Sequence, residues 1–154
     1  MLDELDHRII EALREDARMS LRDLAAQVGL SSPSVSERLK RLQERKVIRG
    51  FSVEVDPQAF GYQLQAIVRI RPLPGKLHAV QKLIEATPEF CECDKVTGDD
   101  CFVVRLFVRS IDHLDALMDR IADKAATNTS IVKSQVIARR LPPLAYGGAR
   151  GGRR

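Results

Sequence analysis

The chain has 154 residues and is 44% hydrophobic, which is enough for one ordinary domain or two small ones. No apolar run approaches the roughly 18 residues of a membrane helix, and three cysteines do not suit a disulfide framework, so we expect a cytoplasmic protein that contacts no membrane. The net charge of +4 comes entirely from residues 139–154, which carry five arginines and no acidic residue. Evidence for a nucleic-acid partner therefore has to come from local patterns.

The first 45 residues predict three helices. The first has Asp3 as a plausible N-cap and apolar residues at helical spacing, namely Leu2, Leu5, Ile9, Ile10 and Leu13. The second begins after Ser20 and ends at Gly29, where a left-handed residue is favoured. The third follows at once, with Ser32 as its N-cap and Pro33 in its first turn. Two helices joined by so short a turn form a helix-turn-helix.

Residues 47–55 predict a strand, because Phe51, Val53 and Val55 alternate with polar residues. Three helices followed by a strand or hairpin are typical of a winged helix. We therefore expect a winged helix-turn-helix DNA-binding domain over residues 1–55, followed by a linker over residues 56–61.

The rest of the chain predicts the order strand-helix-strand twice. We expect strands over residues 62–70, 90–97, 102–108 and 131–138, and helices over residues 77–84 and 110–121. This order is the ferredoxin-like βαββαβ fold, so the fold class is α+β and the second domain spans residues 62–142. Residues 143–154 are rich in glycine and arginine with little to bury, which predicts a disordered basic tail.

The third helix carries a basic ridge beside its buried stripe. At about 100° per residue, Val35, Leu39 and Leu42 lie on one side, and the residues of the ridge lie together on another. Arginine can bind guanine edges or phosphates, so we predict DNA contacts from Ser34, Arg38, Arg41 and Arg45. The alternative is a solvated charged face, which the neighbouring turn and wing disfavour. Ser20 and Ser32, at helix N-termini, could contact phosphate, act only as caps, or do both.

Several motifs together resemble the Lrp/AsnC family of leucine-responsive, or feast/famine, regulators. They are Leu2-Asp3-x-x-Asp6, Asp16-Ala17-Arg18, Asp23-Leu24-Ala25, Val28-Gly29-Leu30-Ser31, Arg38-Leu39-Lys40-Arg41-Leu42, Val47-Ile48-x-Gly50-Phe51 and Val96-Thr97-Gly98-Asp99. The resemblance covers roughly residues 2–142. It implies a homo-oligomer, a dimer or an assembly of dimers that reaches an octamer in some members, and an amino acid or related metabolite as the effector.

The resemblance also places an effector pocket around one loop, formed by Thr97, Gly98, Asp99, Asp100 and Cys101. Backbone N–H groups in this turn can hold a carboxylate, and an aspartate can hold an ammonium group. A tight turn without a ligand is the alternative. The chain departs from the common family pattern at Cys101, where an aspartate often stands, and at residues 134–136, so a changed ligand or the loss of one stays open.

The open face of the predicted sheet is expected to carry Ile67, Cys91, Cys93, Val103 and Phe107, and to pair with a second copy. Cys91 and Cys93 are expected on one strand face, but their spacing does not suit a zinc site, so we predict no metal and no cofactor.

We therefore expect a sequence-specific DNA-binding transcriptional regulator that responds to an amino acid. The alternative is a nucleoid-associated protein that organises double-stranded DNA without a ligand. An enzyme is the other rival, but no phosphate loop, metal-ligand spacing or nucleophile motif predicts catalytic residues.

Overall fold

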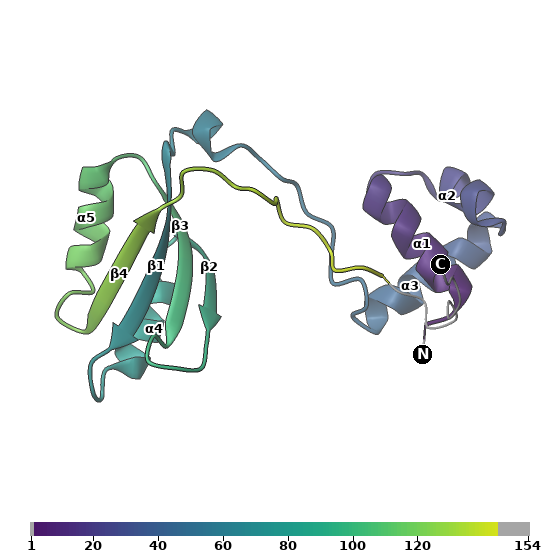
Figure 1. Cartoon of the computed structure of the whole chain (residues 1–154). Coiled ribbons are helices and arrows are strands. Elements are labelled where there is room, and N and C mark those ends of the chain that lie inside the picture. Colours follow the sequence, from purple (N-terminus) through teal and green to yellow (C-terminus); the bar gives the residue numbers. More distant parts are fainter. Residues whose placement is uncertain (1, 145–154) are drawn as a thin grey trace, which may run out of the picture. The chain divides into compact units, whose positions relative to one another are not determined.

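The computed structural model describes residues 2–144, and these form two compact units (Figure 1). Residues 2–53 and residues 139–144 belong to the first unit, and residues 54–138 belong to the second. The predicted tail lies outside the described residues from residue 145 onward. No helix in the described part of the chain is long and apolar enough to cross a membrane.

The first unit is a three-helix cluster made of α1 (Glu4–Glu15), α2 (Leu21–Val28) and α3 (Ser32–Glu44). Asp3 caps α1 through a reciprocal capping box with Asp6, and Gly29 ends α2 at φ +74° in the left-handed region. The helices bury one apolar core, made of Ile9, Ala12, Leu24, Ala25, Val28, Val35 and Leu42. The predicted helix-turn-helix is confirmed.

The N-cap of α3 is Ser31 rather than the predicted Ser32. The Ser31 hydroxyl accepts a hydrogen bond from the Ser34 N–H at 3.3 Å, and Ser32 is already the first helical residue. Pro33 therefore occupies the second position, where its missing N–H still costs nothing. Serine is favoured at a helix N-cap, so the sequence alone allowed either residue. The extended backbone of Ser31 makes it the cap in the structure.

The strand expected over residues 47–55 does not form in the described chain. Residues 47–48 form a bend whose N–H groups donate to the Leu42 carbonyl, and residues 49–55 have no regular secondary structure. Phe51, Val53 and Val55 are 50%, 85% and 60% exposed. The alternation that predicted the strand is present, but no neighbouring strand pairs with its backbone, and a single unpaired strand is not stable.

The second unit is a four-stranded antiparallel sheet with two helices. In chain order it contains β1 (Leu64–Pro72), α4 (Leu77–Glu85), β2 (Phe90–Lys95), β3 (Phe102–Val108), α5 (Ile111–Asp119) and β4 (Ala125–Ile131). The strand order β2-β3-β1-β4 confirms the ferredoxin-like βαββαβ fold. The helix-covered face of the sheet is the core of this unit, and Val68, Phe102, Val104 and Leu106 are at most 2% exposed there.

The fourth strand lies six residues earlier than the sequence predicted. It pairs with β1 from Pro72↔Ala125 to Ala66↔Ile131, whereas residues 132–138 form no strand. Residues 127–130 are polar and exposed, so they lack the apolar alternation that a sequence pattern detects. The edge of β1 determines this strand through backbone hydrogen bonds instead.

A β-bulge separates Cys91 from Cys93, so the prediction that they share a face is wrong. Phe90 pairs with Leu106 and Glu92 with Arg105, which leaves Cys91 as the extra residue. Cys93 then pairs with the buried Val104 and lies on the helix-covered face.

The residues expected as a linker are anchored to the sheet unit. Pro57–Phe60 form a short 3-10 helix, and the Arg109 guanidinium donates to the Phe60 carbonyl at 3.1 Å. The same guanidinium lies 4.7 Å from the centre of the Tyr62 ring. Gly61 between them has φ +82°, a backbone conformation that favours glycine, and a Cβ there would displace the end of the Arg109 side chain, which lies 2.5 Å away.

Candidate DNA-binding and effector-binding sites

The basic ridge of α3 divides into one anchored arginine and two exposed ones. Arg41 and Arg45 are exposed, and neither forms an ion pair within residues 2–144. Arg38 is held against α1, where its Nη1 donates to Asp3 Oδ2 at 2.6 Å and to Asp6 Oδ1 at 2.9 Å. All five side chains line one polar cleft of about 200 Å³.

The Arg38 contacts fix α3 against the start of α1. The Asp6 side chain is 11% exposed and that of Arg38 is 20% exposed, so this pair is largely shielded from water. The pKa of Asp3 lies below its usual value, mainly because the Asp6 N–H bonds to its carboxylate and also because Arg38 does. The two carboxylates in turn raise the pKa of Arg38. The sequence pattern did not predict these contacts, because Arg38 is more than 30 residues from Asp3 and Asp6 along the chain.

The three serines of the predicted DNA site all lie in the first unit. Ser20 caps α2, and its hydroxyl donates to Asp23 Oδ2 at 2.6 Å while accepting from the Asp23 N–H at 3.1 Å. Ser34 is exposed, and its hydroxyl lies 2.8 Å from that of Ser31. Ser32 is half-buried in the first turn of α3. The α2–α3 turn therefore brings Ser34 to the start of the helix that carries Arg41 and Arg45.

The predicted effector loop joins β2 to β3. It is closed by a hydrogen bond from the Val96 N–H to the Cys101 carbonyl at 2.9 Å. Gly98 has φ +104°, with nothing within 4 Å of the position that a Cβ would take. Thr97 and Asp99 are exposed, and Cys101 packs against the sheet core.

An arginine that the sequence analysis did not identify contacts the aspartates of this loop. Arg71, near the end of β1, lies 3.4 Å from Asp100 Oδ1 and 4.0 Å from Asp99 Oδ2. The β1–β3 pairing brings it there, because Ile70 pairs with Phe102 directly after the loop. The loop and the end of β1 thus place one guanidinium and two carboxylates next to each other.

The cysteines show no sign of a reactive or metal-binding site. Burial raises the pKa of both the Cys91 and the Cys93 thiols, which disfavours the thiolate. The described residues contain no group of three or more potential metal ligands.

A helix-turn-helix with a basic second helix, joined to a small sheet domain, defines the class of DNA-binding transcriptional regulators. Residues 2–43 match the AsnC-type helix-turn-helix domain, and residues 65–142 match the Lrp/AsnC ligand binding domain. The chain belongs to the Lrp/AsnC family, and its relatives are HTH-type transcriptional regulators.

Relatives and solved structures agree with this assignment. The HTH-type transcriptional regulator FL11 of Pyrococcus furiosus is 33% identical over 135 residues, covering 86% of this chain and 89% of the relative. The structure of Bacillus subtilis LrpC matches with a TM-score of 0.84 and 27% identity, covering 90% of this chain and 99% of that one. The feast or famine regulatory protein Rv3291c of Mycobacterium tuberculosis, solved with L-methionine, matches with a TM-score of 0.85 and 31% identity over 92% and 99% of the two chains.

Proposed function

We propose that this regulator binds operator DNA through the exposed ridge of α3 and binds a free amino acid at the loop of residues 97–101. The observation that carries the DNA part is the division of the ridge, in which Arg38 is anchored while Arg41 and Arg45 form no ion pair within residues 2–144. Unpaired arginines on a recognition helix are available for guanine edges and phosphates. Ser20 and Ser32 add phosphate contacts at the helix N-termini.

Arg38 has a different role in this proposal from the one expected from the sequence. Its guanidinium is engaged by two carboxylates, so it sets the position of α3 and contacts DNA only through the nitrogen atoms that the aspartates leave unused. Because this side chain bridges two helices, its removal affects the fold as well as any DNA contact.

The effector proposal rests on the complementary charges of the loop. A free amino acid carries one carboxylate and one ammonium group, which match Arg71 and the pair Asp99 and Asp100. The open space at Gly98 gives the ligand access to backbone N–H groups. Rv3291c, a relative with the same fold, was solved with L-methionine. A ligand-binding domain over residues 65–142 favours this regulator over a ligand-free nucleoid protein.

Replacing Gly98 by valine should abolish the response to the effector. Valine is strained at φ +104° and fills the open space, so we expect ligand affinity to fall at least tenfold. The measurement is calorimetry with the best amino acid from a thermal-shift screen, followed by affinity for an operator selected from random duplexes, with and without that amino acid.

Gly75→Val is the matched control, because Gly75 also has a positive φ of +76° and open space, but lies in the turn between β1 and α4. It should keep the response. Wild-type protein should bind its operator at least about 10³-fold more tightly than random DNA. If Gly98→Val and Gly75→Val change effector affinity equally, the effector binds elsewhere. If the protein binds its operator and random DNA with similar affinity, the nucleoid alternative is favoured.

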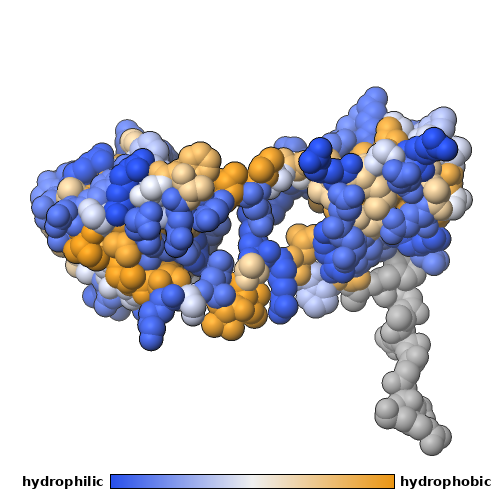
Figure 2. All heavy atoms as spheres, turned by 90° about the horizontal axis from the view of Figure 1, so that it is seen from above, coloured by the Kyte–Doolittle hydropathy of each residue, from blue (hydrophilic) through white to orange (hydrophobic). Residues whose placement is uncertain are grey.

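We further propose that the protein is a homo-oligomer, at least a dimer, that acts on the nucleoid in the cytoplasm. Ile67, Val103 and Phe107 are half-buried on the open face of the sheet, where they alternate with charged residues such as Arg69 and Arg105. Orange apolar patches interrupt the mostly hydrophilic surface in Figure 2, and large apolar side chains such as Val53 and Val136 are highly exposed. A second copy would remove such residues from water.

Replacing Phe107 by glutamate should therefore weaken self-association. Sedimentation velocity at micromolar concentration should show no monomer for wild type and a clear monomer population for Phe107→Glu. Leu73→Glu, at an exposed leucine in the turn after β1, is the control and should sediment like wild type. A monomeric wild-type protein would contradict the proposal.

A further inference from the structure

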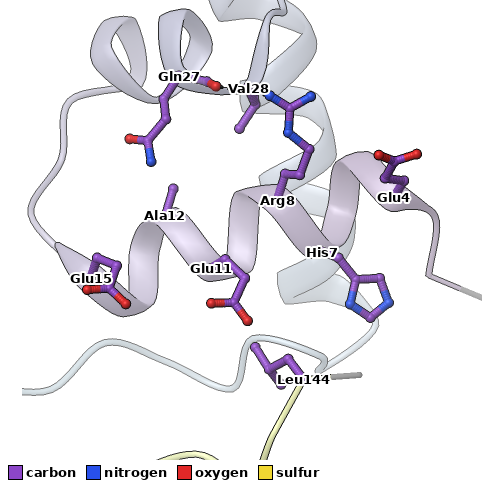
Figure 3. Close-up of a pocket in the computed structure, with 9 residues that line it drawn as sticks. All are labelled: Glu4, His7, Arg8, Glu11, Ala12, Glu15, Gln27, Val28 and Leu144. Atoms are coloured by element: carbon purple, nitrogen blue, oxygen red, sulfur yellow. Dashed lines mark hydrogen bonds between the residues drawn. The ribbon is translucent and has the colours of Figure 1, made fainter. Parts of the chain in front are cut away.

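A pocket on the outer face of α1 is not used by the proposed DNA site or the effector site. Its volume is about 520 Å³, and it is lined by Glu4, His7, Arg8, Glu11, Ala12 and Glu15 of α1, Gln27 and Val28 of the α2 region, and Leu144 (Figure 3). Ala12 and Val28 are each 2% exposed and form the apolar part of the lining. Three glutamates and one cation, Arg8, supply its charged part, and Arg8 donates to the Gln27 carbonyl at 3.1 Å. The arginines of the α3 ridge do not line it.

The acidic side chains of this pocket are only weakly neutralised. Arg14 lies 2.7 Å from Glu11 and 3.2 Å from Glu15, but the side chains involved are 40% to 73% exposed. Such surface pairs exchange partners at little cost. Glu4 forms no ion pair within residues 2–144. Three carboxylates therefore face two arginines, Arg8 and Arg14, which leaves the pocket with a negative charge that another cation can meet.

The chain itself leads into this pocket. Leu144 is half-buried at its edge, and Figure 3 shows Glu11 and His7 projecting from α1 toward the segment that carries it. The ten residues that follow include Arg150, Arg153 and Arg154 and no acidic residue. Arg150 is six residues beyond Leu144, a reach of up to about 20 Å, so the arginines can return to the carboxylates beside Leu144.

We propose that the arginine-bearing segment of residues 145–154 binds the acidic pocket on α1 of its own chain. Leu144 holds the start of the segment at the edge of the pocket, beside Glu11 and His7, and the three arginines pair with Glu4, Glu11 and Glu15. Because the segment is tethered directly beside the pocket, it binds at a high effective concentration and needs little intrinsic affinity. The tail arginines are then held on α1, and DNA must compete for them.

Trypsin tests this proposal on the full-length protein, because it cleaves after Arg150 only when that side chain is free to enter the protease. The triple variant Glu4→Gln, Glu11→Gln, Glu15→Gln removes the charge of the pocket with little change in side-chain size. We expect its initial rate of cleavage after Arg150, followed by intact-mass spectrometry in 50 mM salt without DNA, to be about fivefold that of wild type. The difference should disappear in 0.5 M salt, where surface pairs are screened.

The matched control is Asp112→Asn, Asp115→Asn, Asp119→Asn, which removes three exposed carboxylates from α5 in the other unit. It should leave the rate at its wild-type value, and thermal unfolding should show that both triple variants are folded. Equal rates for wild type and the pocket variant would overturn the proposal. If wild type and the pocket variant are cleaved equally fast, and DNA slows the cleavage of both to the same extent, the segment binds DNA and not the pocket.

Discussion

Replacing Arg41 and Arg45 together by alanine should reduce operator affinity by about two orders of magnitude and leave the folded structure unchanged. Each arginine that contacts a base contributes about 1–3 kcal/mol of binding free energy. Both side chains are exposed and form no ion pair within residues 2–144, so their loss leaves no buried partner unsatisfied. The measurement is a titration against the selected operator at a fixed salt concentration.

A double variant elsewhere separates this effect from a general loss of positive charge. Lys82 on α4 and Arg120 at the end of α5 are exposed, and their replacement by alanine changes the net charge by the same amount. This control should bind with nearly wild-type affinity. If the two double variants bind equally well, the α3 ridge is not the DNA-contacting surface.

Replacing Arg38 by alanine should instead destabilise the first unit, by about 2 kcal/mol in the free energy of unfolding. The variant leaves the Asp6 carboxylate, only 11% exposed, without its cation. Operator affinity should also fall, because α3 loses the two ion pairs that fix it to the start of α1. Denaturant unfolding measures the stability, and Arg18→Ala, at an exposed arginine without an ion pair in the described chain, should unfold like wild type.

A double-mutant cycle with Asp6→Asn identifies the partner. If the pair is responsible, Arg38→Ala should cost much less in the Asp6→Asn background than in wild type. Fully additive effects would show that Arg38 stabilises the protein through another contact.

The stability difference between wild type and Arg38→Ala should also depend on pH. The pKa of Asp3 is lower in the folded state than in the unfolded state, where it is about 4. The interactions of the Asp3 carboxylate therefore stabilise the folded protein fully above pH 4. This stabilisation is lost as the pH falls through the lower folded-state pKa. The difference should therefore be full at neutral pH and shrink as the pH falls from 4 toward 2. The Asp6 N–H still bonds to Asp3 in the variant, so the variant keeps part of the pH dependence.

The sequence predicted those parts of the fold that depend on neighbouring residues. Ser20 marks the start of α2 and Gly29 marks its end, and both were predictable because a cap and a left-handed residue act within one helical turn. The alternation in β3 was equally informative, because this central strand is buried on one face along its whole length. Ser31 rather than Ser32 caps α3 because two adjacent serines satisfy the same local rule.

The features that sequence analysis missed are those that a distant partner decides. Arg38 was placed correctly on the ridge, but its engagement by Asp3 and Asp6 depends on the packing of α1 against α3. Arg71 reaches the effector loop only through the register of β1 with β3. The bulge that turns Cys93 toward the helix-covered face arises from the pairing of β2 with β3. The pattern of apolar and polar residues along β2 alone does not reveal it.

The unpaired segment at residues 47–55 links the stability of the protein to its abundance. Phe51, Val53 and Val55 are at least half exposed, and no strand within residues 2–144 pairs with this segment, so it offers an apolar edge that another polypeptide would remove from water by pairing there. By mass action, stability then rises with the concentration of that polypeptide. If it is a second copy, a cell with few copies holds a larger fraction in a form that chaperones and proteases recognise. Copy number itself would then be an input to the regulator, alongside the metabolite.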